Sequence, residues 1–189
     1  MAISDKTAFL KAVTVVSDSR EKENEHILSA LDQMGVAHEA RKLDMGDYSF
    51  YLPGRDFSLS CAVERKNGPE EIYGNIMEKT GPGRVNRLEK ELEAGSRCLS
   101  QMTVLIEGVA SMDALKAYTV PEWRMKLSPN RVKTDIGETC YAALRAWQAG
   151  NRYHFRVECV ADKTKTAAKL LEEFYYYYHN YKGLIAPRR

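Results

Sequence analysis

The sequence predicts an α/β fold with a mixed central sheet flanked by helices. Segments rich in β-branched and aromatic residues alternate along the chain with segments whose apolar residues recur at helical spacing. Two strand-like segments separated only by a turn signal interrupt this alternation and predict one antiparallel hairpin within the sheet. The chain has 189 residues, 44% of them hydrophobic, which suits a single domain over residues 1–189 with a sizeable core.

The first third of the chain predicts a strand, a helix, a second strand and the hairpin. Residues 13–16 are a β-branched run typical of a buried strand. Residues 23–34 place apolar side chains at helical spacing before Gly35, a residue that commonly ends a helix. Residues 36–43 predict the second strand, and a turn signal at residues 53–56 joins the two arms of the hairpin. The hairpin arms are residues 48–52 and 57–63.

The rest of the chain alternates helices with two strands. Pro69 begins a helix well because its missing N–H is not needed in the first turn, and the Gly-Pro-Gly of residues 81–83 ends that helix. Residues 102–106 and 153–160 predict buried strands. The remaining predicted helices span residues 85–97, 112–118, 132–148 and 163–181, with an irregular segment at 119–129.

The composition says more about the cellular location of the protein than about its biochemical function. The formal net charge of +2 allows binding to nucleic acid but does not argue for it. No stretch approaches the roughly 18 apolar residues of a membrane span, and the N-terminus lacks the pattern of a secretion signal. We therefore expect a cytoplasmic protein with no membrane partner. The cysteines lack metal-site spacing and predict free thiols in a reducing compartment: Cys61, Cys98, Cys140 and Cys159.

Acidic residues stand at the ends of the predicted strands. Asp18 follows the first strand, Asp47 precedes the hairpin, and Glu64 lies at the end of its returning arm. Lys66 lies two residues after Glu64, so both side chains point to the same face of a strand. If the strands are neighbours, the carboxylates converge at one edge of the sheet and repel one another unless a cation lies between them. Oxygen ligands favour Mg²⁺ or Mn²⁺, and a lysine beside such a site suits phosphodiester hydrolysis.

The pair Glu64 and Lys66 is weak evidence when taken alone. An acidic residue followed two positions later by lysine is common in proteins, and most such pairs lie on the solvated surface. Only a longer pattern around the pair can separate a catalytic site from ordinary surface charge.

Such a longer series of motifs is present, and it resembles the XPF-type structure-specific endonuclease domain. The family pattern is Gly-Asp, a variable spacer, Glu-Arg-Lys, three residues and Asp, and this chain has Glu at the last position. The string VVSDSRE resembles the end of the family's first strand, and RLEKELEAGSR with MTVLIEG resembles a following helix and strand. The resemblance is best over residues 13–110. The matching residues are Asp18, Arg20, Glu21, Gly46, Asp47, Glu64, Arg65, Lys66 and Glu70.

The resemblance implies a restriction-endonuclease-like fold and a Mg²⁺- or Mn²⁺-dependent endonuclease that hydrolyses phosphodiester bonds in DNA. Branched or structured DNA, as handled in repair and recombination, is the substrate class that the family implies. Many relatives carry a helix-hairpin-helix module after the nuclease domain, and we expect a stand-alone domain of bacterial or phage type here. The alternative is a non-catalytic DNA-binding or scaffold module of the same fold. The retained acids and lysine favour catalysis.

The resemblance also assigns roles to single residues. Asp47 and Glu64 are expected metal ligands with Asp18 as a third carboxylate, and Lys66 is expected to position the attacking water. Arg65 is expected either to contact phosphate during catalysis or to form a salt bridge that holds the sheet edge. Arg20 and Glu21 would shape the site or form an ordinary charge network. Glu70, in place of the family's last Asp, would be a metal ligand or an acid of the surrounding network.

Two surfaces outside the motifs are candidate contacts. Basic side chains near the Gly-Pro-Gly turn and around Trp123 could contact the DNA backbone, with plain solvated surface as the alternative. Tyr175 and Tyr176 fall outside the expected core face of the last helix and predict a protein interface, which the family would use for a homodimer. The basic side chains are Arg84, Arg87, Arg124, Lys126, Arg131 and Lys133.

Overall fold

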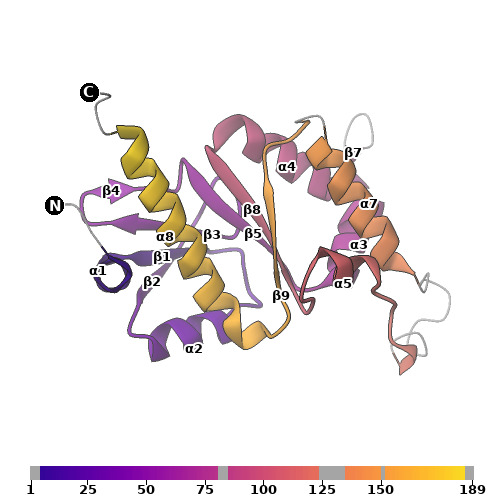
Figure 1. Cartoon of the computed structure of the whole chain (residues 1–189), viewed down its shortest axis with the longest axis horizontal. Helices are drawn as coiled ribbons and strands as arrows, with labels where there is room; N and C mark the ends of the chain where they lie inside the picture. Colours follow the sequence, from indigo (N-terminus) through magenta and orange to yellow (C-terminus); the bar gives the residue numbers. More distant parts are fainter. Residues whose placement is uncertain (1–4, 81–84, 124–134, 150–151, 186–189) are drawn as a thin grey trace.

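The structure is a computed structural model that describes residues 5–80, 85–123, 135–149 and 152–185, and it confirms the predicted α/β fold with a mixed sheet (Figure 1). In these residues the main sheet has seven strands, in the order β2-β1-β3-β5-β8-β9 with the short β4 beside β3. Strand β3 runs antiparallel to β1 and β5, whereas the other pairs along that order are parallel. The strands are β1 (Thr14–Asp18), β2 (Ala37–Arg41), β3 (Tyr48–Leu52), β4 (Arg55–Asp56), β5 (Cys61–Lys66), β8 (Gln101–Glu107) and β9 (Arg156–Val160).

Helices cover both faces of the sheet. Helices α1, α2 and α8 pack on one face, called the α8 face, and α3, α4, α5 and α7 pack on the other, called the α4 face. Figure 1 shows α8 crossing the sheet near α1 and α2. Among the described residues, no helix combines the length and the apolar character needed to cross a membrane. The helices are α1 (Lys6–Ala12), α2 (Glu25–Gln33), α3 (Pro69–Met77), α4 (Arg87–Cys98), α5 (Met112–Lys116), α7 (Ile136–Gln148), the 3-10 helix η2 (Lys163–Lys165) and α8 (Thr166–Ile185).

The sheet separates two apolar cores. Val63 and Leu105 belong to the core on the α8 face, whereas Ile106 belongs to the core on the α4 face. Successive side chains of a strand point to opposite faces of the sheet. Glu64 and Lys66 of β5 therefore point toward the α4 face, and the intervening Arg65 points toward the α8 face.

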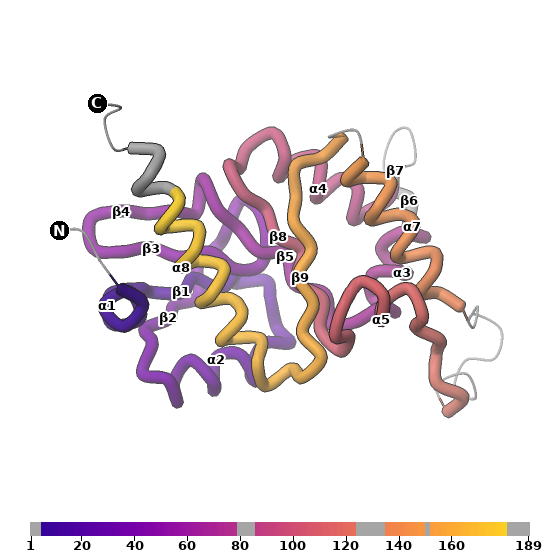
Figure 2. The backbone as a smooth tube through the Cα atoms, viewed as in Figure 1, coloured from indigo at the N-terminus to yellow at the C-terminus, as the bar shows by residue number. Residues whose placement is uncertain are grey.

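The first and last helices of the described chain lie side by side (Figure 2). The ring of Phe9 in α1 packs against Tyr175 and Tyr178 of α8, with centroid separations of 5.5 and 5.8 Å. Helix α1 has no counterpart among the predicted helices, because seven residues are too few to show a helical apolar period. Its start is nevertheless well defined, since the Asp5 carboxylate accepts a hydrogen bond from the Ala8 N–H at 2.7 Å.

The connection between α3 and α4 differs from the prediction. Helix α3 ends at Met77, and Lys79–Thr80 (β6) pairs with Val85–Asn86 (β7) in a separate two-stranded ribbon. Prediction of helix at residues 79–80 and 85–86 was therefore wrong. The two segments pair through a tertiary interaction, and the helical periodicity of the sequence contains no information about it.

The hairpin and the tyrosines of α8 also depart in part from expectation. The returning strand β5 begins at Cys61 instead of at residue 57, and the Glu-Arg-Lys sequence lies at its end, as expected. Tyr175 was predicted to lie outside the core, yet it packs partly buried against the core on the α8 face. Tyr176 is 53% exposed, in agreement with the prediction that it lies outside the core.

Candidate active site

Asp47 is positioned by a close approach of the loop before β3 to strand β5. Gly46 has a φ of 71°, and a Cβ on it would lie 2.9 Å from the Cβ of Ala62 and 3.0 Å from the carbonyl oxygen of Val63. Glycine permits both the conformation and the contact. The Asp47 N–H then donates to the Val63 carbonyl at 2.9 Å, and Asp47 Oδ2 accepts from the Arg65 N–H at 2.8 Å.

Lys66 is buried between carboxylates from three elements. Its side chain is 2% exposed, and its Nζ lies 2.7 Å from Glu64 Oε1. The same Nζ lies 3.2 Å from Glu91 Oε2 of α4 and 3.9 Å from Glu71 Oε1 of α3. A buried ammonium is stable only with such partners, so the surrounding carboxylates explain how a lysine can occupy this position.

The buried charges shift one another's pKa values. Burial raises the pKa of Glu64, and the charge of the neighbouring Asp47 raises it further. Burial also raises the pKa of Asp47, against the opposing effects of the Arg65 N–H and the Lys66 charge. Burial alone would lower the pKa of Lys66, but Glu64 and Glu91 raise it above its ordinary value. The ammonium is therefore charged, and the two carboxylates favour additional positive charge beside them.

Asp18, at the end of β1, binds neighbouring groups of the protein through its carboxylate. Its carboxylate accepts from Arg20 Nε and Nη2 at 2.8 Å each and from the Leu43 N–H at 2.8 Å. The hydrogen bonds from Arg20 lower the pKa of Asp18 to about 2. This residue lines the same cavity as Asp47 and Glu64, but its oxygens are already engaged.

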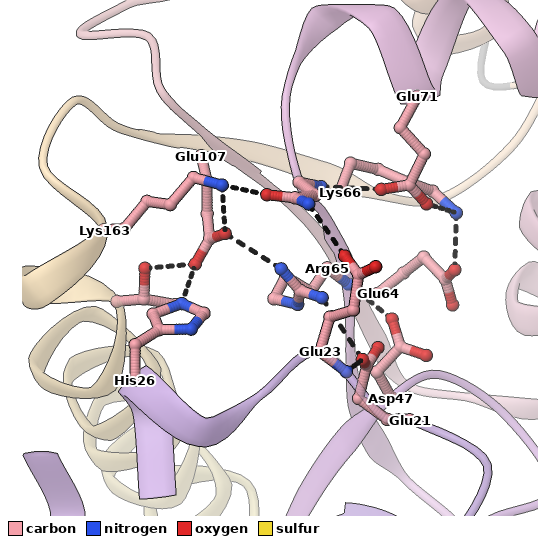
Figure 3. A network of polar contacts seen from close by, with 12 residues as sticks. Glu21, Glu23, His26, Asp47, Glu64, Arg65, Lys66, Glu71, Glu107 and Lys163 are labelled. Carbon is pink, nitrogen blue, oxygen red and sulfur yellow. Dashed lines mark hydrogen bonds and ion pairs between the residues drawn. The ribbon is translucent and has the colours of Figure 1, made fainter. Parts of the chain in front are cut away.

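Arg65 belongs to an ion-pair network on the α8 face (Figure 3). Its Nη1 lies 2.9 Å from Glu107 Oε2 and its Nη2 lies 3.2 Å from Glu21 Oε1. Glu107 is fully buried and also accepts from Thr166 at 2.6 Å, with His26 Nε2 at 2.7 Å. Although burial raises the pKa of Glu107, the hydrogen bonds from Thr166 and His26 and the charge of Arg65 lower it overall. Arg65 was expected either to contact phosphate or to form a salt bridge. Its side chain forms salt bridges, with Glu107 and Glu21.

A cavity of about 360 Å³ is lined by Asp18, Asp47, Glu64 and Lys66. A second cavity of about 460 Å³ shares three of its lining residues, Glu21, Arg65 and Glu71, with the first. Of the two cavities, Glu70 lines only the second. Its carboxylate accepts a hydrogen bond from the Tyr118 hydroxyl at 2.7 Å. The structure thus brings Asp47, Glu64 and Lys66 together in the first cavity but places Glu70 in the second.

The expected DNA-contacting residues are only partly described. Arg87 lines the first cavity, is 56% exposed and pairs with Glu91 at 3.2 Å. The other five lie outside the described residues: Arg84, Arg124, Lys126, Arg131 and Lys133.

Two acidic residues of the site were not predicted from the sequence. Glu91 in α4 contacts Lys66, and Glu107 at the end of β8 contacts Arg65. A signal for Glu91 exists, because it lies one turn after Leu88 and directly before Leu92, both buried, and so borders the buried side of its helix. Glu107 ends a largely apolar buried strand, which is an unusual place for an unpaired charge and indicates a buried partner.

The donor set fits a hard divalent cation. Asp47 and Glu64 present carboxylate oxygens to one cavity, and such ligands suit Mg²⁺ or Mn²⁺. Within the described part of the chain, no group of three or more His, Cys, Asp and Glu side chains is placed to hold a metal ion. Mg²⁺ is commonly held by only one or two carboxylates, with water and substrate phosphate as the other ligands. The pair Asp47 and Glu64 is sufficient for that mode of binding.

Comparison with known proteins agrees with this architecture. A family model described as the ERCC4 domain matches residues 17–172. The solved structure of XPF from Aeropyrum pernix is similar with a TM-score of 0.57 and 23% identity, covering 86% of this chain and 65% of that one. The structure of the same protein in complex with DNA gives the same TM-score and identity, covering 88% of this chain and 65% of that one. The chain thus spans slightly less than two thirds of those structures. No curated protein matches the sequence.

Proposed function

The chain belongs to the ERCC4 domain family, and from this premise we propose that it is a metal-dependent endonuclease that hydrolyses phosphodiester bonds in branched or otherwise structured DNA. The observation that carries the proposal is the convergence of Asp47, Glu64 and the buried Lys66 in one cavity. A solved structure of similar fold is a complex with DNA, which supports DNA as the substrate.

Each residue of the cavity has a chemical task in this proposal. Asp47 and Glu64 would hold Mg²⁺ or Mn²⁺, and a bound ion of this kind polarises phosphate and lowers the pKa of a water molecule. The Lys66 ammonium would orient the attacking water or stabilise negative charge on the phosphoryl oxygens. Asp18 would support the site by fixing Arg20 and the Leu43 backbone, and a ligand role for its carboxylate would require exchange of those contacts.

Cleavage assays test the function directly. Purified protein is incubated with labelled duplex, single-stranded, flap and four-way-junction DNA, with Mg²⁺, Mn²⁺ or EDTA. We expect cleavage with either metal, preference for a branched substrate, and loss of cleavage in EDTA. Substitution Glu64→Gln removes a proposed ligand and should lower the rate by a factor of about 100 or more.

The matched control is Glu93→Gln, because Glu93 lies on α4 and pairs with Arg97 on the helix surface. Its cleavage rate should equal that of the wild type. DNA binding without cleavage under every metal condition would overturn the enzymatic proposal and would support the alternative of a non-catalytic DNA-binding or scaffold module.

A homodimer and a cytoplasmic location complete the proposal. The exposed Tyr176 ring on α8 supports a protein interface there. All four cysteines lie in the described residues and are free, which supports a reducing compartment. Light scattering of the wild type and of Tyr176→Ser would test the dimer, and equal monomer masses for both would contradict it.

A further inference from the structure

The position of Lys66 poses a problem for the proposed metal site. Its Nζ lies 2.7 Å from Glu64 Oε1, and Glu64 is also a proposed ligand of the divalent ion. A metal–oxygen bond of about 2.1 Å at the same carboxylate would bring two positive charges close together. Their repulsion would weaken the contact between Lys66 and Glu64 just when the ammonium is needed in the cavity. Lys66 therefore requires a second partner that does not bind the metal.

Glu91 has the geometry of such a partner. Its Oε2 lies 3.2 Å from Lys66 Nζ, and its Oε1 accepts from Arg87 Nε at 3.2 Å, so each oxygen faces a different cation. The carboxylate is carried by α4, whose Leu88 and Leu92 are fully buried in the core on the α4 face. It is thus held in place by two ion pairs and by a well-packed helix.

Glu71 is less suited to this task. Its nearest oxygen is 3.9 Å from Lys66 Nζ, beyond hydrogen-bonding distance. Its Oε2 accepts from the Asn67 N–H at 2.7 Å, and its side chain is 40% exposed. Figure 3 shows Glu71 beside Lys66, on the side away from Glu107.

We propose that Glu91 is a positioning residue that holds the Lys66 ammonium in the cavity when Glu64 binds a metal ion. The inference rests on the proposed function and deepens it, because it assigns a task to a residue to which the sequence motifs had assigned none. In this role Glu91 acts through Lys66, the cation that its Oε2 contacts. Its charge also offsets part of the cost of burying the ammonium.

The first test needs no catalytic activity. Lysine ammonium groups that are buried and hydrogen-bonded exchange their protons slowly, so NMR of ¹⁵N-labelled protein should show a Lys66 signal that is missing in Lys66→Met. In Glu91→Ala this signal should shift or disappear in the metal-free protein. It should persist in the matched control Glu93→Ala, which makes the same change on the same helix. A Lys66 signal unaltered by Glu91→Ala would overturn the proposal.

The second test is a double-mutant cycle on cleavage. Glu91→Ala should lower kcat by about 10-fold or more, with KM for DNA nearly unchanged, since the ammonium acts in the chemical step. In the Lys66→Met background the same change should have no further effect, because Glu91 acts through Lys66. Equal losses in both backgrounds would contradict the proposal. If the wild type does not cleave DNA, the proposed function fails, and the NMR result still decides whether Glu91 positions Lys66.

Discussion

Gly46 sets the distance between the loop that carries Asp47 and strand β5. Substitution Gly46→Ala should destabilise the protein by about 1–3 kcal/mol and lower cleavage, because it adds backbone strain and pushes the loop away from Ala62 and Val63. Urea unfolding and the cleavage assay measure the two effects. The control is Gly54→Ala, where φ is also positive at 79° but a Cβ would meet nothing within 4 Å among the described residues. Equal effects at both positions would show that strain alone is responsible.

The lowered pKa of Asp18 predicts that the free energy of unfolding depends on pH. The pKa of Asp18 is lowered from 3.8 to about 2 by its hydrogen bonds with Arg20. Because the folded protein has the lower pKa, the stabilisation is complete above pH 3.8 and is lost as the pH falls toward 2. Asp18→Asn should therefore cost about 1–2 kcal/mol at pH 7 and progressively less below pH 4. Urea unfolding at pH 7 and pH 3 checks this, and a cost independent of pH would contradict it.

At the level of residues, local patterns predicted which side chains come together at the centre of the candidate site. Asp47, Glu64 and Lys66 come together because the alternation of β5 puts Glu64 and Lys66 on one face and the Gly-Asp loop hydrogen-bonds to the same strand. Glu91 and Glu107 were missed because their partners are distant in the sequence, and only the packing of α4 and β8 on β5 brings them near. Their contacts are tertiary, so the apolar pattern around each residue indicates a partly buried charge but does not identify its partner.

Among the helices, Gly137 lets α7 pack against the end of α5. A Cβ on Gly137 would lie 2.2 Å from the carbonyl oxygen of Leu115 and 2.7 Å from the backbone of Tyr118. Gly137→Ala should thus force the two helices apart and destabilise the protein by about 2 kcal/mol or more. Thermal unfolding monitored by circular dichroism measures the change.

The comparison variant for Gly137 is Gly74→Ala in α3. Within the described structure a Cβ there would meet nothing within 4 Å, so alanine should raise stability by about 0.5–1 kcal/mol through its better helix propensity. A neutral Gly137→Ala would mean that α5 and α7 are not in the contact described.

At the level of elements, long apolar segments were predictable and short ones were not. The strands around Val104 and Val15 are buried β-branched runs, so composition and pattern agree with their packing. Helix α1 is short and is stabilised by Phe9 packing against the last helix, and each strand of the ribbon at Lys79–Thr80 and Val85–Asn86 has only two residues. Such elements depend on partners elsewhere in the chain, which a local pattern does not contain.

For the molecule as a whole, Glu107 links the sheet to the helices on its α8 face. It joins Arg65 of β5, His26 of α2 and Thr166 of α8. Glu107→Ala would leave Arg65 buried with only part of its charge compensated, and should cost about 3–5 kcal/mol of unfolding free energy. In contrast, Glu93→Ala breaks an exposed pair and should cost less than about 0.5 kcal/mol. Urea unfolding compares them, and similar values would contradict a supporting role for Glu107.

The pairing of α1 with α8 has a consequence for the order in which the protein folds. The core on the α4 face draws its residues from Ile72 to Phe155, whereas the core on the α8 face combines Phe9 with Tyr178. During synthesis the core on the α8 face cannot be completed until residues 166–185 have been translated, so until then only α1 and α2 cover β1 and β3 on that face. Contacts of such high sequence separation slow folding. The part of the sheet formed by β1, which ends at Asp18, and by β3, which follows Asp47, is therefore only partly covered and open to chaperones and to aggregation until α8 has been made.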